Sequence, residues 1–399
     1  MLRRSHKKSR GGCTECKRRH VKCDEKQPVC GLCAVSDRVC SYVSPAQVKT
    51  AVDTASVPRG KRHRKASTQT PASLPLTPSS PTSSPGPSLL QEPSSDAAVN
   101  LDHMDLLIHV AQDSDMFNLG TGVENYNYSG LSLGLREANK TPYLLHAILA
   151  FSAQHLACLR PERAAHYLHQ AVSLQTRAIS LFNASWTAVD ESNCVAVLLF
   201  SSVLGHHFLA ETLSKRHPDG LDAFIEHYVQ CINMHRGIFV IAYSAWPLLM
   251  KSDLEPMLSM SHAFTLREPV GKDCHSLHNL INRSPDLSED EKMATRTAIN
   301  YLQLGFDVGG ADVGLCQGQH QMIYNWAMLV PPMFTALLES KRPEALVVMA
   351  YYAVLLHRGK ELWQVGDAGV YIFDLIWNDL GPEWEEFLKY PREKIVGEA

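Results

Sequence analysis

Six cysteines between residues 13 and 40 constrain this 399-residue chain more than any other feature. They follow the spacing C-x2-C-x6-C-x6-C-x2-C-x6-C and are Cys13, Cys16, Cys23, Cys30, Cys33 and Cys40. A C-x2-C pair lets one turn of chain present two sulfurs to one tetrahedral zinc ion. The spacing repeats, so each half consists of such a pair followed by a third cysteine. The stretch therefore predicts a small fold that is organised by metal.

The number of metal ions follows from the number of ligands. Four cysteines could hold one ion, which would leave Cys23 and Cys40 unused. Two ions need eight metal–sulfur bonds, which six cysteines supply only when two of them bridge. The symmetric spacing favours two zinc ions, and a single-zinc ribbon is the alternative. A disulfide framework would need a secreted protein, and the N-terminal segment MLRRSHKKSR contains no apolar signal. A metallothionein-like metal store would not enclose a basic helix.

The stretch SRGGCTECKRRHVKCDEKQPVCGLCAVSDRVCSY, residues 9–42, resembles the fungal binuclear zinc-cluster DNA-binding domain. In that family the first and fourth cysteines bridge the two zinc ions, which implies Cys13 and Cys30 here. The proline of the loop between the halves corresponds to Pro28. The resemblance therefore implies two zinc ions per chain and double-stranded DNA as the partner.

The family's basic helix after the second cysteine corresponds to five side chains here. They are Lys17, Arg18, Arg19, His20 and Lys22. The family pattern places Arg19 and His20 at the base edges, where arginine can bind guanine O6 and N7. His20 departs from the lysine or arginine that is common there. The other three are expected to contact phosphate, which positions a protein on DNA without reading sequence. The alternative is a solvated basic helix face.

The zinc is expected to be structural. A segment this short buries too little apolar surface to fold alone, so the metal supplies the folding free energy. No ligand position remains open for water, as catalytic zinc requires. Residues 1–42 carry eleven basic and four acidic side chains. Two zinc ions and six thiolates would leave this unit about five charges positive, which favours salt-dependent phosphate binding.

Residues 43–100 are expected to be a linker without a stable fold. A second basic cluster there is interpreted as a nuclear localisation signal or a DNA backbone contact: Arg59, Lys61, Arg62, Arg64 and Lys65. A charged linker without a specific role is the alternative. Residues 66–95 are rich in proline, serine and threonine, a composition typical of disorder. Residues 43–100 contain no heptad seam, so a homodimer would have to form through the C-terminal domain.

Residues 101–392 are predicted to form an all-helical domain. Thr141 and Pro142 begin one predicted helix, and Pro161 with Glu162 begins the next. Asp190 is predicted to cap a third helix through Leu209. Further helices are predicted to begin at the capping box formed by Ser288 and Glu291, between Trp326 and Leu338 with a break at Pro331 and Pro332, and from Pro343 to Leu356. Apolar positions of the second helix at helical spacing are Tyr167, Leu168, Ala171, Val172, Leu174, Ala178, Ile179 and Phe182.

This body is similar to the regulatory domain of fungal zinc-cluster factors of the sterol-uptake-control type. The similarity is carried by TPYLLHAILAFSAQHLACLRP, by Tyr167 and Gln175, by NWAMLVPPMFTALLESKRPEALVVMAYYAVLL and by WEEFLKYP. It implies an activation function, contact with transcription machinery or co-regulators, and a small apolar ligand such as a sterol. Aromatic and other large side chains would line a ligand pocket or, as is more common at helical spacing, form plain core: Trp326, Met328, Phe334, Tyr351, Tyr352, Trp363, Tyr371, Phe373 and Trp377.

The sequence contains no signal for an enzyme or a membrane span. No H-E-x-x-H, G-x-S-x-G or P-loop motif occurs. The pairs His206 with His207 and His166 with His169 could bind metal, although such histidines more often lie at the surface or are satisfied in the core. The glycines Gly309, Gly310 and Gly314 are interpreted as a turn. No run of eighteen or more uninterrupted apolar residues occurs, which argues against a membrane span.

The sequence as a whole predicts a zinc-cluster domain over residues 9–42, a linker over residues 43–100 and an all-α regulatory domain over residues 101–392. The expected function is that of a nuclear, sequence-specific, DNA-binding transcription factor for RNA polymerase II genes, not an enzyme. Its target genes are expected to belong to sterol regulation or secondary metabolism. The alternative class is a helical scaffold whose zinc cluster mediates protein contacts.

Overall fold

The structure is a computed structural model that describes residues 11, 13–18, 23–26, 30, 33, 40–42, 99–117, 127–186, 188–308 and 320–397. The chain divides into two compact units, Met1–Leu89 and Leu90–Ala399. Several sequence predictions lie outside the described residues: Arg19, His20, Pro28, Lys22, the basic cluster at 59–65, the composition and missing heptads of residues 43–98, and the glycine turn at 309–314.

The N-terminal unit is organised by its cysteines. Helix α1 spans Thr14–Arg18 and is the helix found among the described residues of this unit. The Thr14 N–H donates to the Ser41 carbonyl at 2.9 Å, which joins α1 to the segment after the sixth cysteine. Five of the six cysteines are buried. Among the described residues of this unit, these cysteines form the core, with Cys40 and Tyr42 packed against them.

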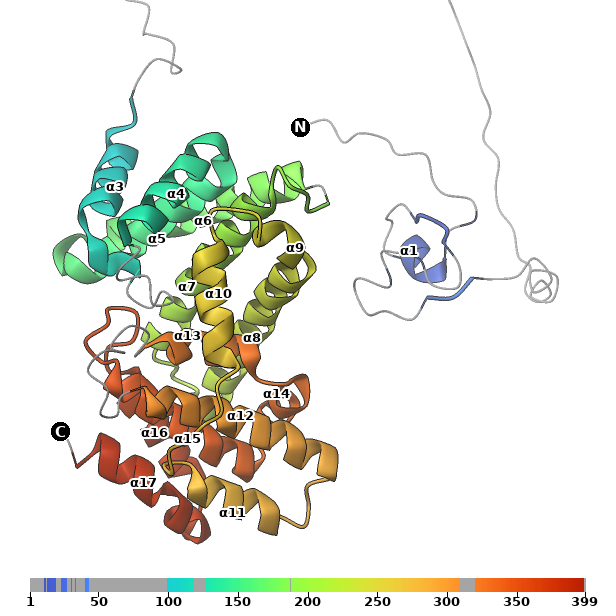
Figure 1. Ribbon diagram of the computed structural model, residues 1–399, viewed down its shortest axis with the longest axis vertical. Coiled ribbons are helices and arrows are strands. Elements are labelled where there is room, and N and C mark those ends of the chain that lie inside the picture. The colour runs from blue at the N-terminus through green and yellow to red at the C-terminus, as the bar shows by residue number, and fades with distance from the viewer. Residues whose placement is uncertain are drawn as a thin grey trace, which may run out of the picture. The chain divides into compact units, whose positions relative to one another are not determined.

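Every regular element described in the C-terminal unit is helical, which confirms the all-α prediction (Figure 1). The helices are α3 (Leu101–Gln112), α4 (Asn127–Lys140), α5 (Pro142–Leu159), α6 (Ala164–Ser185), α7 (Cys194–Ser214), α8 (Gly220–Ser244), α9 (Trp246–Leu249), α10 (Glu255–Thr265), α11 (His275–Arg283), α12 (Glu289–Asp307), α13 (Gln321–Leu329), α14 (Pro332–Glu339), α15 (Pro343–Arg358), α16 (Ala368–Asp379) and α17 (Glu385–Ile395). Short 3₁₀ turns lie at Ser114–Phe117, Pro161–Arg163 and Pro382–Trp384.

Local signals set several helix ends as predicted. Pro142 begins α5, and the proline pair separates α13 from α14. Ser288 and Glu291 form the predicted capping box, in which each side chain accepts from the backbone N–H of the other. The prediction for Asp190 was wrong. Its carboxylate accepts from the Ser192 N–H at 2.8 Å in a turn, and α7 begins only at Cys194.

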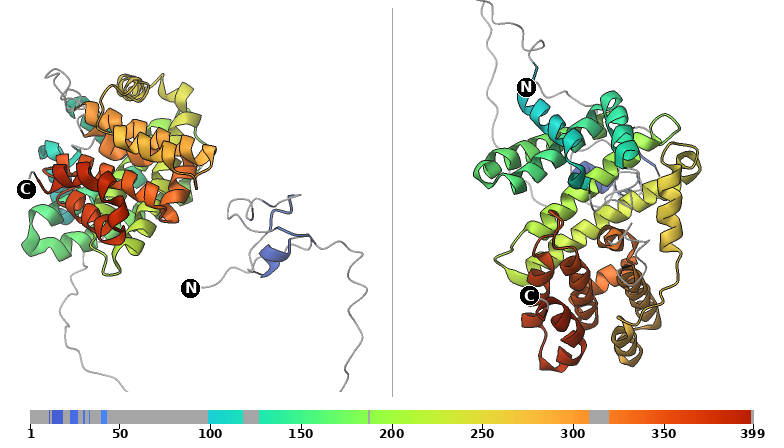
Figure 2. Two further views of the ribbon diagram at one scale, coloured as in Figure 1. Left: turned by 90° about the horizontal axis from the view of Figure 1, so that it is seen from below. Right: turned by 60° about the vertical axis from the view of Figure 1, so that its left-hand side comes forward.

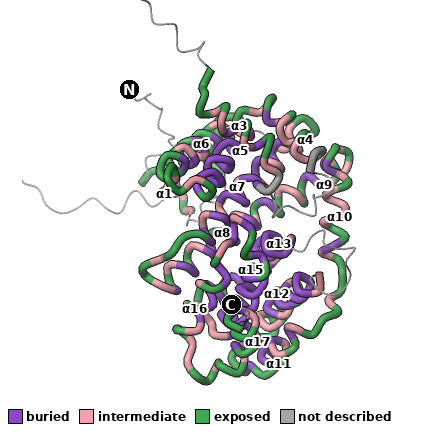
Figure 3. Tube along the Cα trace, turned by 90° about the vertical axis from the view of Figure 1, so that its left-hand side faces the viewer, coloured by how far each residue is buried: buried purple, intermediate pink, exposed green. Residues whose placement is uncertain are grey.

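The helices of this unit form three consecutive groups along its length. Helices α3–α6 gather at one end, α7, α8 and α13 lie in the middle, and α11, α12 and α14–α17 gather at the other end (Figures 1 and 2). The largest core cluster is formed mainly by α8 and α11–α17, and smaller clusters join α3, α5, α6 and α7. The burial of α5, α7 and α15 along most of their lengths makes them the central helices (Figure 3).

Helix α6 buries only part of its apolar surface. Tyr167, Ala171, Leu174 and Ala178 are buried against α5, whereas three other apolar residues at helical spacing are exposed: Leu168 by 49%, Val172 by 63% and Ile179 by 39%. The apolar residues of α6 extend around more of the helix than one neighbour can cover, since a surface helix normally hides one stripe. Periodicity alone does not show which part of a wide stripe faces the core.

Two helices, α5 and α7, are long and apolar enough to cross a membrane by length and composition. In the structure 67% of an 18-residue stretch of each helix is buried against the rest of the unit. Burial of this extent is typical of the core helices of a globular domain, and it explains why these two helices are predominantly apolar.

Candidate metal centre

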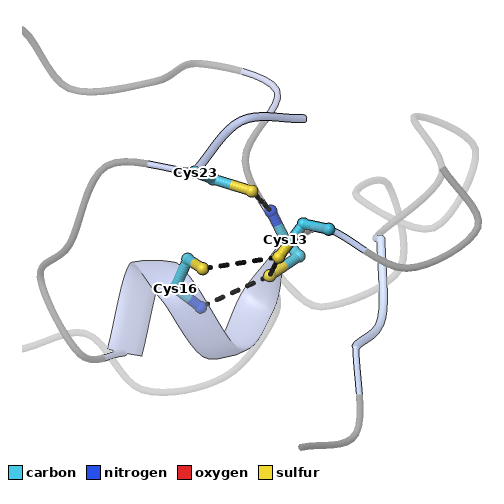
Figure 4. A group of neighbouring side chains, drawn as sticks. Cys13, Cys16 and Cys23 are labelled. Carbon is cyan, nitrogen blue, oxygen red and sulfur yellow. Dashed lines mark hydrogen bonds between the residues drawn. The ribbon is translucent and has the colours of Figure 1, made fainter. Parts of the chain in front are cut away.

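Helix α1 brings the first two cysteine sulfurs together. Cys13 stands directly before the helix and its carbonyl accepts from the Lys17 N–H at 3.1 Å. Cys16 lies on the first turn, where its backbone N–H donates to the Cys13 Sγ at 3.4 Å. Figure 4 shows Cys23 reaching toward this pair from a separate segment, and the Cys13 N–H donates to the Cys23 Sγ at 3.5 Å. The first turn of α1 and the segment that contains Cys23 therefore place three sulfurs close together.

The second half of the motif repeats the hydrogen bond of the first. The Cys30 N–H donates to the Cys40 Sγ at 3.3 Å, as the Cys13 N–H does to Cys23. In both halves the donor is the first cysteine and the acceptor is the third. The repeated spacing in the sequence therefore corresponds to a repeated local geometry.

The sulfur distances are those of a zinc–thiolate cluster. Cys13 Sγ lies 3.7 Å from the Sγ atoms of both Cys30 and Cys33, and Cys16 Sγ lies 3.7 Å from Cys30 Sγ. Sulfurs bound to one zinc ion at about 2.3 Å in a tetrahedron lie roughly 3.7–3.8 Å apart. A disulfide would require about 2.05 Å. These sulfurs are spaced for a shared metal ion and not for a covalent bond.

The six sulfurs fall into two groups of four. One group is Cys13, Cys16, Cys23 and Cys30, and the other is Cys13, Cys30, Cys33 and Cys40. Within each group the sulfurs lie within 4.8 Å of one another. The groups share Cys13 and Cys30, the two residues to which the resemblance assigned the bridging role. Each group has four donors, which is the number that a closed structural zinc site requires.

The thiol pKa values of the cluster imply that zinc binding displaces protons. The backbone N–H of Cys16 holds the pKa of the Cys13 thiol at about 6. Burial raises the pKa of Cys16 to about 12 and also raises the pKa values of Cys30 and Cys33. Because zinc binds thiolates, metal must displace the protons from these buried sulfurs, and zinc affinity should fall with falling pH.

Tyr42 was not predicted as part of the site. Its hydroxyl lies 3.7 Å from the Cys23 Sγ and donates to the Lys26 carbonyl at 2.9 Å. It therefore links the last part of the motif to the segment after Cys23. Residues next to metal ligands commonly orient those ligands. The position of Tyr42, two residues after the sixth cysteine, was therefore the sequence signal that could have pointed to this role.

Of the five predicted DNA contacts, the structure describes Lys17 and Arg18. Both are exposed on the last turn of α1, whereas Cys16 of the same helix is buried. Arg18 forms a two-pronged ion pair with Glu15, with N–O distances of 3.0 and 2.9 Å. A phosphate contact by Arg18 would therefore have to share or replace this pairing. No ion pair of Lys17 is found among the described residues.

The matches to known proteins agree with this geometry. Residues 11–49 match the fungal Zn(2)-Cys(6) binuclear cluster domain, a domain that binds two zinc ions. The cluster and its match support a role in DNA-binding transcription regulation for a chain whose residues 11–49 resemble this domain.

Its relatives in particular are Zn(2)-C6 fungal transcription factors. A Zn(2)-C6 fungal-type transcription factor of Gibberella zeae is 25% identical over 443 residues, covering 98% of this chain and 86% of that protein. The Aspergillus fumigatus factor afumD is 25% identical over 366 residues, or 88% of this chain and 86% of its own. Sterol uptake control protein 2 of Candida albicans is 46% identical over 76 residues, which is 18% of this chain and 11% of that protein.

The histidine pairs of the C-terminal unit do not form the metal sites considered from the sequence. His206 and His207 are buried in α7, where burial lowers their pKa values to about 3 and about 4. The His206 ring stacks on Tyr324 at 4.0 Å. His166 and His169 are exposed on α6. None of the four belongs to a group of potential ligands among the described residues.

The aromatic residues considered for a ligand pocket pack against one another. Trp326 stacks on Tyr352 with ring centroids 4.5 Å apart and meets Phe334 edge-on at 5.8 Å. The Trp326 indole N–H donates to the Ala298 carbonyl at 3.0 Å. Three more of the set, Met328, Tyr371 and Trp377, are half-buried at the edges of core clusters. These contacts are those of a packed helical core.

Proposed function

We propose that this protein is a nuclear, zinc-dependent transcription factor that binds specific sequences in double-stranded DNA and regulates RNA polymerase II genes. The observation that carries the proposal is the pair of four-sulfur groups that share Cys13 and Cys30. This arrangement suits two structural zinc ions and leaves no site for catalysis. The ligand set is then Cys13, Cys16, Cys23, Cys30, Cys33 and Cys40, with the first and fourth of them bridging.

The basic helix would be the DNA-reading element. In this proposal Arg19 and His20 contact base edges, whereas Lys17, Arg18 and Lys22 contact phosphate. The exposure of Lys17 and Arg18 on α1 supports this assignment. Phosphate contacts would make binding steeply salt-dependent, and the base contacts would supply sequence preference.

The remaining parts of the chain would serve regulation. Residues 43–100 would form the linker, with the basic side chains of residues 59–65 directing nuclear import or extending the contact with the DNA backbone. Residues 101–392 would form the regulatory domain that contacts co-regulators or the transcription machinery. Dimerisation, where it occurs, would use this helical domain.

The proposed target genes are those of secondary metabolism, with sterol regulation as the second candidate. Similarity to the sterol uptake control protein covers 18% of the chain, so it does not extend over the helical unit as a whole. The mutual packing of Trp326, Phe334 and Tyr352 also favours plain core over an apolar ligand pocket at that place. Transcript profiles of a deletion strain would distinguish the two gene classes.

The decisive experiment combines zinc analysis with selection of bound duplexes from a random pool. A fragment of residues 1–89, the first of the two units of the chain, should contain two zinc ions. The full chain should enrich one short motif. Arg19→Ala should weaken binding to that motif by about 5- to 150-fold, since a bidentate guanine contact contributes about 1–3 kcal/mol.

The matched control is Arg177→Ala, at an exposed basic position on α6 in the other unit. It should leave both affinity and motif unchanged. Two zinc ions without an enriched motif would contradict the proposal and favour a scaffold whose cluster contacts protein. One zinc ion would contradict the ligand assignment itself.

A further inference from the structure

A cluster of potential metal ligands lies in the C-terminal unit, away from the cysteines. It consists of His109 near the end of α3, Asp113 directly after α3, and His155 on α5. One ligand atom from each lies within 4.8 Å of the other two. His109 Nε2 and His155 Nδ1 are 3.1 Å apart, and the Asp113 Oδ2 lies 3.9 Å from His109 Nδ1. Residues 46 positions apart are thus brought together by the packing of α3 on α5.

The distance between the imidazole nitrogens suits a shared ion. Two nitrogens bound to zinc at about 2.0–2.1 Å in a tetrahedron lie roughly 3.3–3.4 Å apart. The observed 3.1 Å differs from this by a few tenths of an ångström. Asp113 stands at the rim, with 26% of its side chain exposed, so a rotation could bring its carboxylate to the same ion.

Neighbouring contacts hold the cluster in place. His155 is 2% exposed, and its ring stacks on Trp363 at 4.6 Å with an interplanar angle of 21°. The Trp363 indole N–H and the Gln364 amide both donate to the Met116 carbonyl at 3.1 Å. Met116 follows Asp113 closely in the chain. The ligand-bearing segments are therefore pinned by packing that does not involve the ligands' own nitrogens, as a pre-organised metal site requires.

The charged groups around the cluster leave it suitable for a cation. Burial lowers the pKa of His109, which favours the neutral imidazole that binds metal; the Asp113 and Asp105 carboxylates partly offset this and Arg160 adds to it. Arg160 is itself paired with Asp105 at 3.7 Å and donates to the Tyr167 hydroxyl at 2.7 Å. Two carboxylates against one guanidinium leave a local charge of minus one. A divalent ion would therefore enter a site with a compensating negative charge.

We propose that His109, His155 and Asp113 form a third metal site of this protein, which takes zinc or a similar divalent transition ion and clamps α3 to α5. Imidazole and carboxylate donors suit such ions, and water would complete the coordination. Because α3 is the first described helix of the C-terminal unit, the site would couple metal supply to the order of the segment nearest the linker. The alternative is a simple hydrogen bond between the two imidazoles.

The test uses the full chain equilibrated with buffered free zinc. Wild-type protein should hold three zinc ions per chain, and His109→Gln should hold two. Asp113→Asn replaces a charged ligand by a neutral one and should weaken zinc binding at this site by roughly 10–100-fold, the range found when carboxylates of metal sites are changed. His103→Gln is the matched control on the same helix, because His103 contacts His146 instead of the cluster. It should retain three ions.

A second measurement reads the site directly. Cobalt bound next to His155 should quench the fluorescence of the stacked Trp363, and the quenching should disappear in His109→Gln. Thiolate–cobalt absorption bands from the cysteine cluster should remain in that variant, which separates this proposal from the function of the cluster. Two ions in wild-type protein, or an unchanged third ion in His109→Gln, would overturn the proposal. Circular dichroism of each variant checks that the helices are intact. If His109→Gln unfolds, Asp113→Asn still tests the proposal, because the Asp113 side chain is partly exposed and its change should disturb packing less.

Discussion

Gly369 of α16 lies against the backbone of α15 so closely that a β-carbon at position 369 would stand 2.6 Å from the Ala353 carbonyl oxygen. The same β-carbon would lie 2.6 Å from the His357 nitrogen. Both neighbours are backbone atoms of a buried helix, so no side chain can move aside. Gly369→Ala should force α15 and α16 apart and destabilise the protein by about 1–3 kcal/mol, the usual cost of overpacking. Urea unfolding followed by circular dichroism would measure it.

Gly237→Ala on α8 is the matched control, because a β-carbon there meets nothing within 4 Å. An interior helical glycine is less favourable than alanine by about 0.5–1 kcal/mol, so this change should stabilise the protein slightly. Equal effects of the two substitutions would contradict the close approach of α15 and α16.

The capping box at the start of α12 should contribute measurably to stability. Ser288→Ala removes the acceptor of the Glu291 N–H and should cost about 1 kcal/mol. Thr141 occupies the corresponding position of α5, but its side chain makes no capping hydrogen bond. Thr141→Ala should therefore cost clearly less in the same unfolding measurement. A loss as large as that of Ser288→Ala would show that Thr141 caps α5 after all.

Bridging and terminal cysteines should differ in their effect on zinc content. Cys30 belongs to both four-sulfur groups, whereas Cys40 belongs to one. In a fragment of residues 1–89, Cys30→Ser should release both zinc ions and Cys40→Ser should release one more readily than the other. Metal analysis after dialysis against a weak chelator would decide it. Loss of the same number of ions from both variants would exclude the shared-ligand arrangement.

Acid should weaken the C-terminal unit before carboxylates titrate. Burial lowers the pKa values of His206 to about 3 and of His207 and His235 to about 4. An unfolded histidine titrates near 6.5, so below that pH the unfolded chain binds more protons than the folded one. The stabilisation is complete above about pH 6.5 and is lost as pH falls toward 4, by up to about 1.4 kcal/mol per pH unit for each histidine.

His206→Phe isolates one of these groups, because it keeps an aromatic ring against Tyr324 and removes the titrating nitrogens. The free energy of unfolding, measured in urea from pH 8 to 4.5, should show a shallower slope below pH 6.5 in the variant. Above pH 7 the two proteins should differ by a constant amount. Parallel curves over the whole range would mean that His206 takes up no proton on unfolding.

The predictions from sequence succeeded where neighbouring residues decide the outcome. Pro142 and the pair Ser288 and Glu291 mark helix ends because capping and proline geometry act within one turn. The cysteines likewise collect around shared positions because their short spacings leave little choice of geometry. The roles of Arg19 and His20 in reading DNA stay predictions, since both lie outside the described residues.

The sequence by itself determined the metal-organised N-terminal unit and the helical class of the remainder, because ligand spacing and helix signals are local. The tertiary structure alone decided which side of α6 is covered, and it left Val172 exposed. It also decided that His206 is buried. It alone brought His109 to within hydrogen-bonding distance of His155. Such pairings depend on how helices far apart in the chain pack, and the free energy of that packing is shared among many residues at once.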